Sequence, residues 1–235
     1  MGTATLFLLN PTGGVLGGDN LDTAVELGAG AHVCLSTPSA TRVYRSNGAS
    51  SVVRTTLRVG EGARLEFTPD HLILSPGARL AQRLDVELAP GASAIVSDAW
   101  AVGRVARGEA WRFDLLDSGI VARDAEGLLF KDRLVLQGTA RWGGLGGAEG
   151  MAYVATMLCL APAHPALGDL ERALARSLIA LTREATVGVT ALARGGVVAR
   201  ILASTAPAMQ SLVAHAWAAC RAELWALPPQ LLRKM

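Results

Sequence analysis

The feature that most constrains this fold is a unit that recurs three times in the first hundred residues. In each unit an alternating apolar run leads to a Gly-Ala pair and then to a second alternating run. The pairs are Gly30-Ala31, Gly62-Ala63 and Gly91-Ala92, roughly 30 residues apart. Alternation predicts strands with one buried face, and a glycine between two such runs indicates a β-hairpin. A unit that recurs at this spacing must stack on its neighbours to cover its apolar face.

Residues 1–140 are therefore expected to form stacked β-hairpins, as a layered β-sandwich or a helix-like β structure. Further strands are predicted at residues 111–116 and 128–136, with polar reversals at 117–119 and 124–127. Residues 141–235 are expected to contain about two α-helices. One follows a cap at Asp169, and the other spans residues 208–227 before Pro228-Pro229 stops it. The prediction is a single, mostly β domain (all-β or α+β) over 1–235.

Composition excludes several functional classes. Hydrophobic residues make up 51% and charged residues 18%, which excludes a disordered chain and indicates apolar surface that is buried or covered by partners. The net charge of +2 is scattered, so nucleic acid is not an expected partner. Three distant cysteines without a CxxC motif favour a reducing, cytoplasmic location. The apolar stretch 151–163 is shorter than the roughly 20 residues that span a bilayer, so no membrane segment is expected.

The densest motif is the glycine-rich block Asn10–Asp19. Gly13 and Gly18 have the outer spacing of a phosphate-binding loop, but Asp19 stands where that loop requires lysine, which argues against nucleotide binding. Paired glycines also allow tight turns or close backbone approach. Asp19 can then close an Asx-turn or serve as a weak oxygen ligand for a divalent cation.

His32 and Cys34 lie two apart on a predicted strand, so they share a face and are weak metal-ligand candidates. Two ligands do not make a metal site, and we expect no tightly bound cofactor. The loop 37–46 reads equally well as an ordered turn or as a binding surface. The segment 103–109 is expected to supply internal ion pairs or a partner-facing loop. The sequence shows no nucleophile with an evident base.

Four blocks together resemble the motif series of the urease accessory protein UreD (UreH) family, in the same order. They are Asn10–Asp19, Thr37–Ser46, Leu65–Asp70 with Pro76–Ala78, and Gly103–Glu109. The resemblance implies a β-rich, non-catalytic scaffold that binds UreF and the GTPase UreG in a dimeric accessory complex, docks on the urease apoprotein and helps to deliver nickel. The motif residues expected to bind partners are Gly17, Gly18, Thr41, Tyr44, Arg45, Arg104, Arg107 and Gly108.

The resemblance also suggests a hypothesis for nickel transit. Carboxylate oxygens hold a borderline metal less tightly than thiolate and imidazole ligands do, which suits a relay. The expected nickel path consists of Asp19, Glu66, Asp70 and Glu109. Family members usually carry strands before the first block, whereas nine residues precede Asn10 here. We expect the opening strands to be missing and a sheet edge to be exposed, which predicts aggregation or dependence on partners.

Two other functional classes remain open from the residues alone. A carbohydrate-active hydrolase on stacked hairpins would use two of the four carboxylates, about 5 or 6.5–9.5 Å apart in an open cleft. A plain β interaction module would need no metal at all. Nickel-dependent urease activation in the presence of the partner proteins distinguishes the three.

Overall fold

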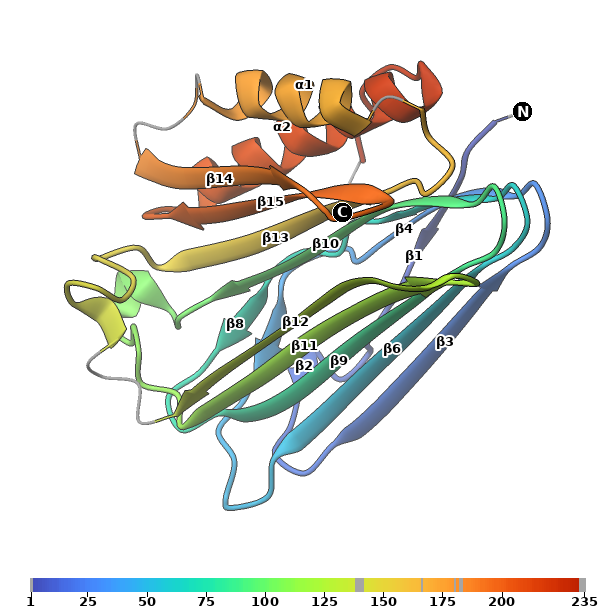
Figure 1. The fold of residues 1–235 in the computed structure, drawn as a ribbon. Helices are drawn as coiled ribbons and strands as arrows, with labels where there is room; N and C mark the ends of the chain where they lie inside the picture. The colour runs from blue at the N-terminus through green and yellow to red at the C-terminus, as the bar shows by residue number, and fades with distance from the viewer. Residues whose placement is uncertain (1, 138–141, 166, 180, 182–183, 233–235) are drawn as a thin grey trace.

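The computed structural model describes residues 2–137, 142–165, 167–179, 181 and 184–232. They form three layers: two helices, a ten-stranded sheet and a five-stranded sheet (Figure 1). The mostly β prediction and the two C-terminal helices are confirmed. The helices are α1 (Leu167–Ile179) and α2 (Ala206–Trp225).

The ten-stranded sheet lies between the helices and the other sheet. Its main path runs β1-β4-β7-β10-β13-β15-β14. Beside this path, β8 pairs with β10, β5 with β8, and β2 with β5. Its strands are β1 (Ala4–Phe7), β2 (Gly14–Val15), β4 (His32–Ser36), β5 (Thr41–Val43), β7 (Arg64–Phe67), β8 (Leu72–Leu74), β10 (Ser93–Ala101), β13 (Tyr153–Leu160), β14 (Ala185–Ala191) and β15 (Gly196–Ala203).

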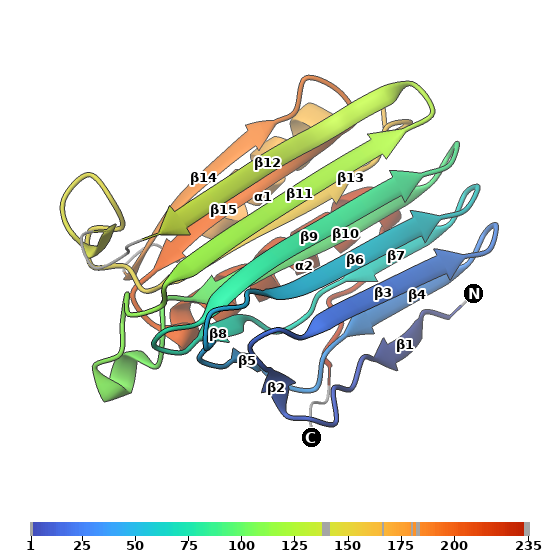
Figure 2. The ribbon, with the colours of Figure 1, turned by 90° about the horizontal axis from the view of Figure 1, so that it is seen from below.

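The five-stranded sheet has the order β12-β11-β9-β6-β3. Its strands are β3 (Asn20–Leu27), β6 (Ser51–Val59), β9 (Arg79–Leu88), β11 (Leu115–Asp124) and β12 (Gly127–Gln137). Figure 2, seen from below, shows these strands running side by side in front of the first sheet.

The recurring unit is a coil of a solenoid-like stack, and the hairpin interpretation of it is wrong. Each Gly-Ala turn joins a strand of the five-stranded sheet to a strand of the ten-stranded sheet, as β3 leads to β4. Each strand pairs in parallel with its counterpart one coil away: β3 with β6 and β6 with β9 in one sheet, and β4 with β7 and β7 with β10 in the other. Alternation and a glycine specify a reversal between two strands, but they do not specify which strand each one pairs with.

The turns themselves stack on one another. Gly30, Gly62 and Gly91 all have left-handed backbone conformations, with φ of 66°, 61° and 70°. The Gly30 N–H donates to Glu61 O at 2.8 Å, and the Gly62 N–H donates to Pro90 O at 3.0 Å. Each coil therefore aligns the next at this end of the molecule.

The later strands confirm one predicted reversal and correct another. Residues 124–127 form the hairpin between β11 and β12, as expected. Residues 117–119 lie inside β11, whose start at Leu115 overlaps the predicted strand 111–116 by two residues only. The polar outward residue Asp117 resembled a turn signal because it sits on the solvent face, where it pairs with two arginines.

The apolar core has two main parts. One fills the space between the sheets, and the other lies between the ten-stranded sheet and the helices. Helix α1 contributes Leu170, Leu174 and Leu178 to the second part. Asp169 lies in the first turn of α1 rather than capping it. Among the described residues, no helix is both long and apolar enough to cross a bilayer.

Candidate functional site

Parts of all four motif blocks meet at the end of the coil stack opposite the Gly-Ala turns, whereas residues 65–67 of the third block directly follow the Gly62-Ala63 turn. The Tyr44 N–H donates to Val15 O at 2.8 Å, and the Ser46 N–H donates to Gly77 O at 3.0 Å. The phenol of Tyr44 also lies close enough to Arg104 to raise the pKa of that guanidinium slightly, behind the larger effect of Glu109. We call residues 10–19, 37–46, 76–78 and 103–109 the motif end; in Figure 2 it lies around β2, β5 and β8.

Two glycines of the first block permit close approach of backbones. A Cβ on Gly14 would lie 2.5 Å from Arg42 O, and one on Gly17 would lie 2.8 Å from Ser46 Cα. Gly18 takes a left-handed conformation with φ of 88°. The Asp19 carboxylate accepts from the Leu16 N–H at 2.8 Å and so closes the turn formed by residues 16–19. In this position Asp19 shapes the loop.

The last block is organised by a bidentate ion pair. Arg104 donates to both carboxylate oxygens of Glu109, at 2.6 and 2.7 Å. This contact lowers the pKa of Glu109, while Gly108 ends the short 3₁₀ helix η1 (Val105–Arg107) in a left-handed conformation. Arg107 and Arg45 are exposed, whereas Thr41 and Tyr44 are half-buried. The motif end thus presents three exposed arginines, Arg42, Arg45 and Arg107.

Glu66 lies elsewhere, fully buried beneath α2. Its carboxylate accepts from Trp217 Nε1 at 2.6 Å and from His32 Nε2 at 2.8 Å, and it forms an ion pair with Arg221. Burial lowers the pKa of His32 more than the bond to Glu66 raises it. Cys34 is also fully buried on the helix-facing side of β4. These groups attach α2 to the sheet.

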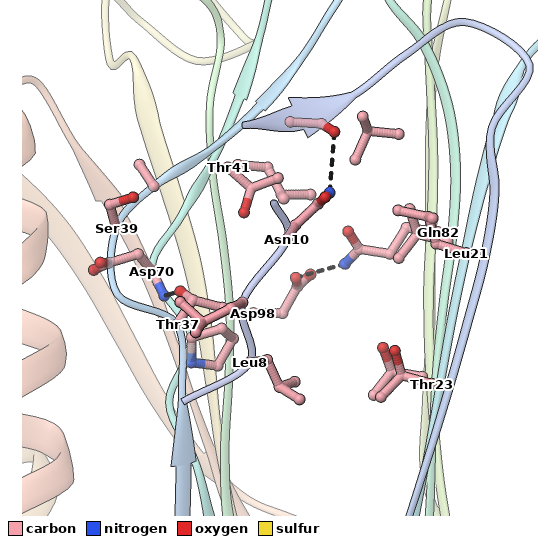
Figure 3. A pocket seen from close by; sticks show the side chains of 18 of the residues that line it. Leu8, Asn10, Leu21, Thr23, Thr37, Ser39, Thr41, Asp70, Gln82 and Asp98 are labelled. Atoms are coloured by element: carbon pink, nitrogen blue, oxygen red, sulfur yellow. Dashed lines mark hydrogen bonds between the residues drawn. The ribbon is translucent and has the colours of Figure 1, made fainter. Parts of the chain in front are cut away.

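A cavity of about 600 Å³ lies between the two sheets at the side of the motif end (Figure 3). Of the expected site residues in the described chain, Thr41 and Asp70 line it, and Asp19, Glu66 and Glu109 do not. Of the four expected nickel-path carboxylates, Asp70 alone therefore lines this cavity. The polar and charged residues that line this cavity are Asn10, Asn20, Asp22, Thr23, Thr37, Ser39, Thr41, Asp70, Gln82, Arg83 and Asp98.

Asp98 is the central acidic group of this cavity, and the sequence reasoning missed it. Gln82 Nε2 on β9 donates to Asp98 Oδ1 on β10 at 2.6 Å, so the pair bridges the two sheets. The Ser118 hydroxyl lies 3.5 Å from Oδ2. Burial among protein atoms raises the pKa of Asp98, although part of its surface faces the cavity. The sequence did contain a signal for it. Asp98 follows Ala94 and Val96 at a spacing of two residues and so points to the same, inward face of the strand, where burying a carboxylate costs free energy unless it is paired or bonded.

Polar groups continue from Asp98 towards the opposite side of the sandwich. Asp98 lies beside Thr156 on β13, which lies beside Arg200 on β15. Arg200 in turn pairs with Asp132 of β12 at 2.9 Å. We call Gln82, Asp98, Ser118, Thr156, Arg200 and Asp132 the polar layer. Within the described ranges, no group of three or more His, Cys, Asp or Glu residues could hold a metal ion.

Comparisons with known proteins agree along the whole chain. A family model described as "UreD urease accessory protein" matches residues 1–234. A protein of Haloarcula marismortui named urease accessory protein UreD is 37% identical over 98% of this chain and 77% of its own length. Proteins of the same name from Alkalilimnicola ehrlichii and a Methylobacterium species are 34% and 39% identical, over 95% and 83% of this chain and 75% and 70% of their own lengths.

Proposed function

The chain belongs to the UreD family of urease accessory proteins, and from that premise we propose that it passes divalent nickel through the polar layer between its sheets. Membership in the family supports a role in urease maturation. In our proposal the chain is a non-catalytic scaffold that holds UreF and the GTPase UreG on the urease apoprotein. Nickel is its cargo.

The observation that carries this proposal is the position of Asp98. It is an inward-facing carboxylate, bridged to Gln82, at the wall of a cavity of about 600 Å³. Amide, hydroxyl and carboxyl oxygens bind a borderline metal weakly and exchange it, so they suit transit better than storage. The raised pKa of Asp98 adds competition between a proton and the cation, which favours release.

The structure supports a different set of path residues from the one expected from sequence. We propose that Thr41, Asp70 and Asp98 line the passage. Glu66 is engaged by three donors under α2, and Glu109 is held by Arg104. We propose that the motif end, with exposed Arg45 and Arg107, is a partner surface. Arginine is favoured as an interface anchor.

The test is urease activation with the variant Asp98→Asn, produced together with UreF, UreG and urease. Asparagine keeps the acceptor for Gln82 but removes the negative charge. We expect the nickel content and activity of urease to fall roughly tenfold or more, as for other metal-site substitutions, while the complex still co-purifies. Asp85→Asn, on the outward face of β9 in the five-stranded sheet, is the matched control and should activate normally.

Full activation by Asp98→Asn would remove the passage and leave a plain interaction module. Loss of co-purification would instead assign Asp98 to assembly.

A further inference from the structure

The strand β12 is an exposed edge of the five-stranded sheet. Among the described residues it pairs with β11 on one side and with no strand on the other, and Figure 2 shows it at the margin of its sheet. With 11 residues it is the longest of the described strands that end the two sheets, ahead of β1, β3 and β14. The backbone N–H and C=O groups along a free edge can pair with an added strand.

The edge lacks features that usually block such pairing. No proline interrupts residues 127–137, and the register shift in the β11–β12 pair lies at Ala122/Arg123, close to the hairpin. Residues 130–137 therefore form a regular ladder with β11. The opposite margin differs, because β3 carries the charged residues Asp22 and Glu26, which form ion pairs with the neighbouring strand. Of these two margins, β12 is the one suited to accept a strand.

Large apolar side chains remain uncovered along β12. Leu128, Leu134 and Val135 are 54%, 38% and 48% exposed. Leu134 lies two residues before the buried Leu136, so both side chains point to the inward face of the sheet. Leu134 is nevertheless exposed, because β12 is the last strand of its sheet. An added strand would cover Leu134 and extend the apolar core.

Ion pairs hold this edge in place from the inner side. Asp132 of β12 pairs with Arg200 of β15 at 2.9 Å. At the hairpin, Arg194 donates to both carboxylate oxygens of Asp124, at 2.6 and 2.8 Å. A strand that is already ordered loses little conformational entropy when it binds another strand. The edge is therefore preorganised for strand addition.

The charge on the outward face indicates what kind of strand fits. Arg133 points outward, because it pairs with Asp117 on the solvent face of β11. The exposed Lys131 lies two residues earlier on the same face. Over the outward face of β11 and β12, Arg123, Lys131 and Arg133 stand against Asp117. This margin therefore has an excess of positive charge, which favours an acidic occupant.

A second copy of this chain is a poor occupant of the edge. Antiparallel pairing of two β12 strands about their midpoint, Asp132, would place Lys131 of one copy directly opposite Arg133 of the other. It would also place the two Asp132 side chains opposite each other. Like charges in directly opposite positions are destabilising. The charges of β12 therefore favour a strand of different sequence.

We propose that β12 accepts an extended segment of a partner protein as an added strand, and that this segment alternates acidic and apolar residues. Its acidic side chains lie beside Lys131 and Arg133 on the outward face, and its apolar side chains cover Leu134 on the inward face. This surface is additional to the motif end, none of whose residues belongs to β12. The inference rests on the scaffold role proposed above, and it does not need the nickel passage.

Amide hydrogen exchange tests strand addition directly. The full chain is measured alone and then in complexes with UreF, with UreG and with apo-urease. Added backbone hydrogen bonds protect the amides of an edge strand, so we expect exchange at residues 130–137 to slow roughly tenfold or more in at least one of these complexes. The partner that causes this protection is the one used with the variants.

Two variants test the chemistry of the occupant. Lys131→Glu reverses a charge on the outward face, and Leu134→Lys places a charge where the added strand would cover an apolar side chain. Each is expected to weaken binding of that partner roughly tenfold or more. Arg176→Glu and Ile179→Lys make comparable changes at exposed positions on α1 and should bind normally. Thermal unfolding checks the fold, and Lys131→Glu at an exposed position remains informative if Leu134→Lys does not fold.

The outcomes separate this inference from the function on which it rests. Complexes that form while β12 exchanges as fast as in the free chain would overturn strand addition and leave the scaffold role intact. Weaker binding of Lys131→Glu without protection of β12 would show an electrostatic contact only, which also overturns it. Normal binding by both variants would have the same meaning. If none of the three partners binds the unmodified chain, the scaffold role and the inference both fail.

Discussion

Two buried carboxylates have opposite environments. Glu66 is surrounded by Arg221, Trp217 and His32, which satisfy its charge and its oxygens. Asp98 has the amide of Gln82, a more distant hydroxyl and an adjacent cavity. A charge that is fully paired holds a structure together, whereas a charge that is poorly paired is available to another cation.

Asp98 should make the protein less stable as pH rises. Its pKa is raised in the folded state, so the folded chain holds a proton that the unfolded chain has already lost. The loss of folding stability that comes from ionising Asp98 is absent at pH values below the ordinary pKa of 3.8, and it is complete at pH values above the folded-state pKa. We therefore expect Asp98→Asn to increase the free energy of unfolding at about pH 7. The increase should become smaller as the pH falls towards 3.8, the ordinary pKa of an aspartate.

Denaturant unfolding of both proteins across a pH series measures this difference. A gain that is constant with pH, or a loss at neutral pH, would contradict it.

Glu66→Gln should destabilise the fold strongly. The substitution keeps the shape of the side chain but leaves the buried guanidinium of Arg221 without its counter-charge. Breaking a buried pair in this way costs about 3–5 kcal/mol. Chemical denaturation measures the loss, and Glu26→Gln, on an exposed pair with Arg58, is the control and should cost about 1 kcal/mol or less. Equal losses for the two variants would show that the buried network is not the anchor of α2.

At the scale of elements, the glycine turns test the coil description. Gly62 has a left-handed backbone and open space around it, so Gly62→Ala should cost only the conformational penalty of about 1–2 kcal/mol. Two residues earlier, a Cβ on Gly60 would lie 2.4 Å from Leu27 O of the preceding coil. Gly60→Ala should therefore cost more, because neighbouring coils must separate. Thermal unfolding compares the variants, and a smaller loss at Gly60 would argue against tight stacking of the turns.

The sequence predicted the elements well and their pairing poorly. Period-two alternation marks which residues face the core, and it located the strands on both sides of Gly30, Gly62 and Gly91. Pairing depends on contacts between residues about 30 positions apart, such as Leu27 with Val59 and Val59 with Leu88, and local alternation carries no information about them. The hairpin at residues 124–127 was predicted because its contacts are local.

The candidate site shows the same limit. Glu66 and Asp70 lie four residues apart in the sequence, but one faces α2 in the core and the other lines the cavity between the sheets. The end of β7 between them changes the direction of the chain. Asp98 was overlooked because it lies within an apolar strand, away from the turns where functional residues are usually sought.

At the scale of the molecule, the proposed partner surface and the proposed nickel passage occupy different parts of the fold. The motif end gathers four distant blocks, while the polar layer lies behind it between the sheets. Charge reversal of exposed Arg45 and Arg107 should therefore weaken the complex and leave the fold unchanged. We expect Arg45→Glu with Arg107→Glu to reduce co-purification of UreF or urease roughly tenfold or more.

Unfolding of the double variant serves as the check on its fold, and Arg176→Glu on exposed α1 is the matched control. Normal recovery of every partner by the double variant would exclude the motif end as a docking surface.

The contacts that attach α2 to the sheet join residues that are synthesised at different times. Glu66 and Arg221 are 155 residues apart, so the carboxylate leaves the ribosome long before its counter-charge does. At about 5–20 residues per second, the interval is roughly 8–30 s. During that time the coils can form, but the face that receives α2 stays open to water, and Glu66 on it has His32 but not yet Trp217 or Arg221 as a partner. A nascent chain stalled before residue 221 should therefore be protease-sensitive along β4 and β7, and the full chain should be protected.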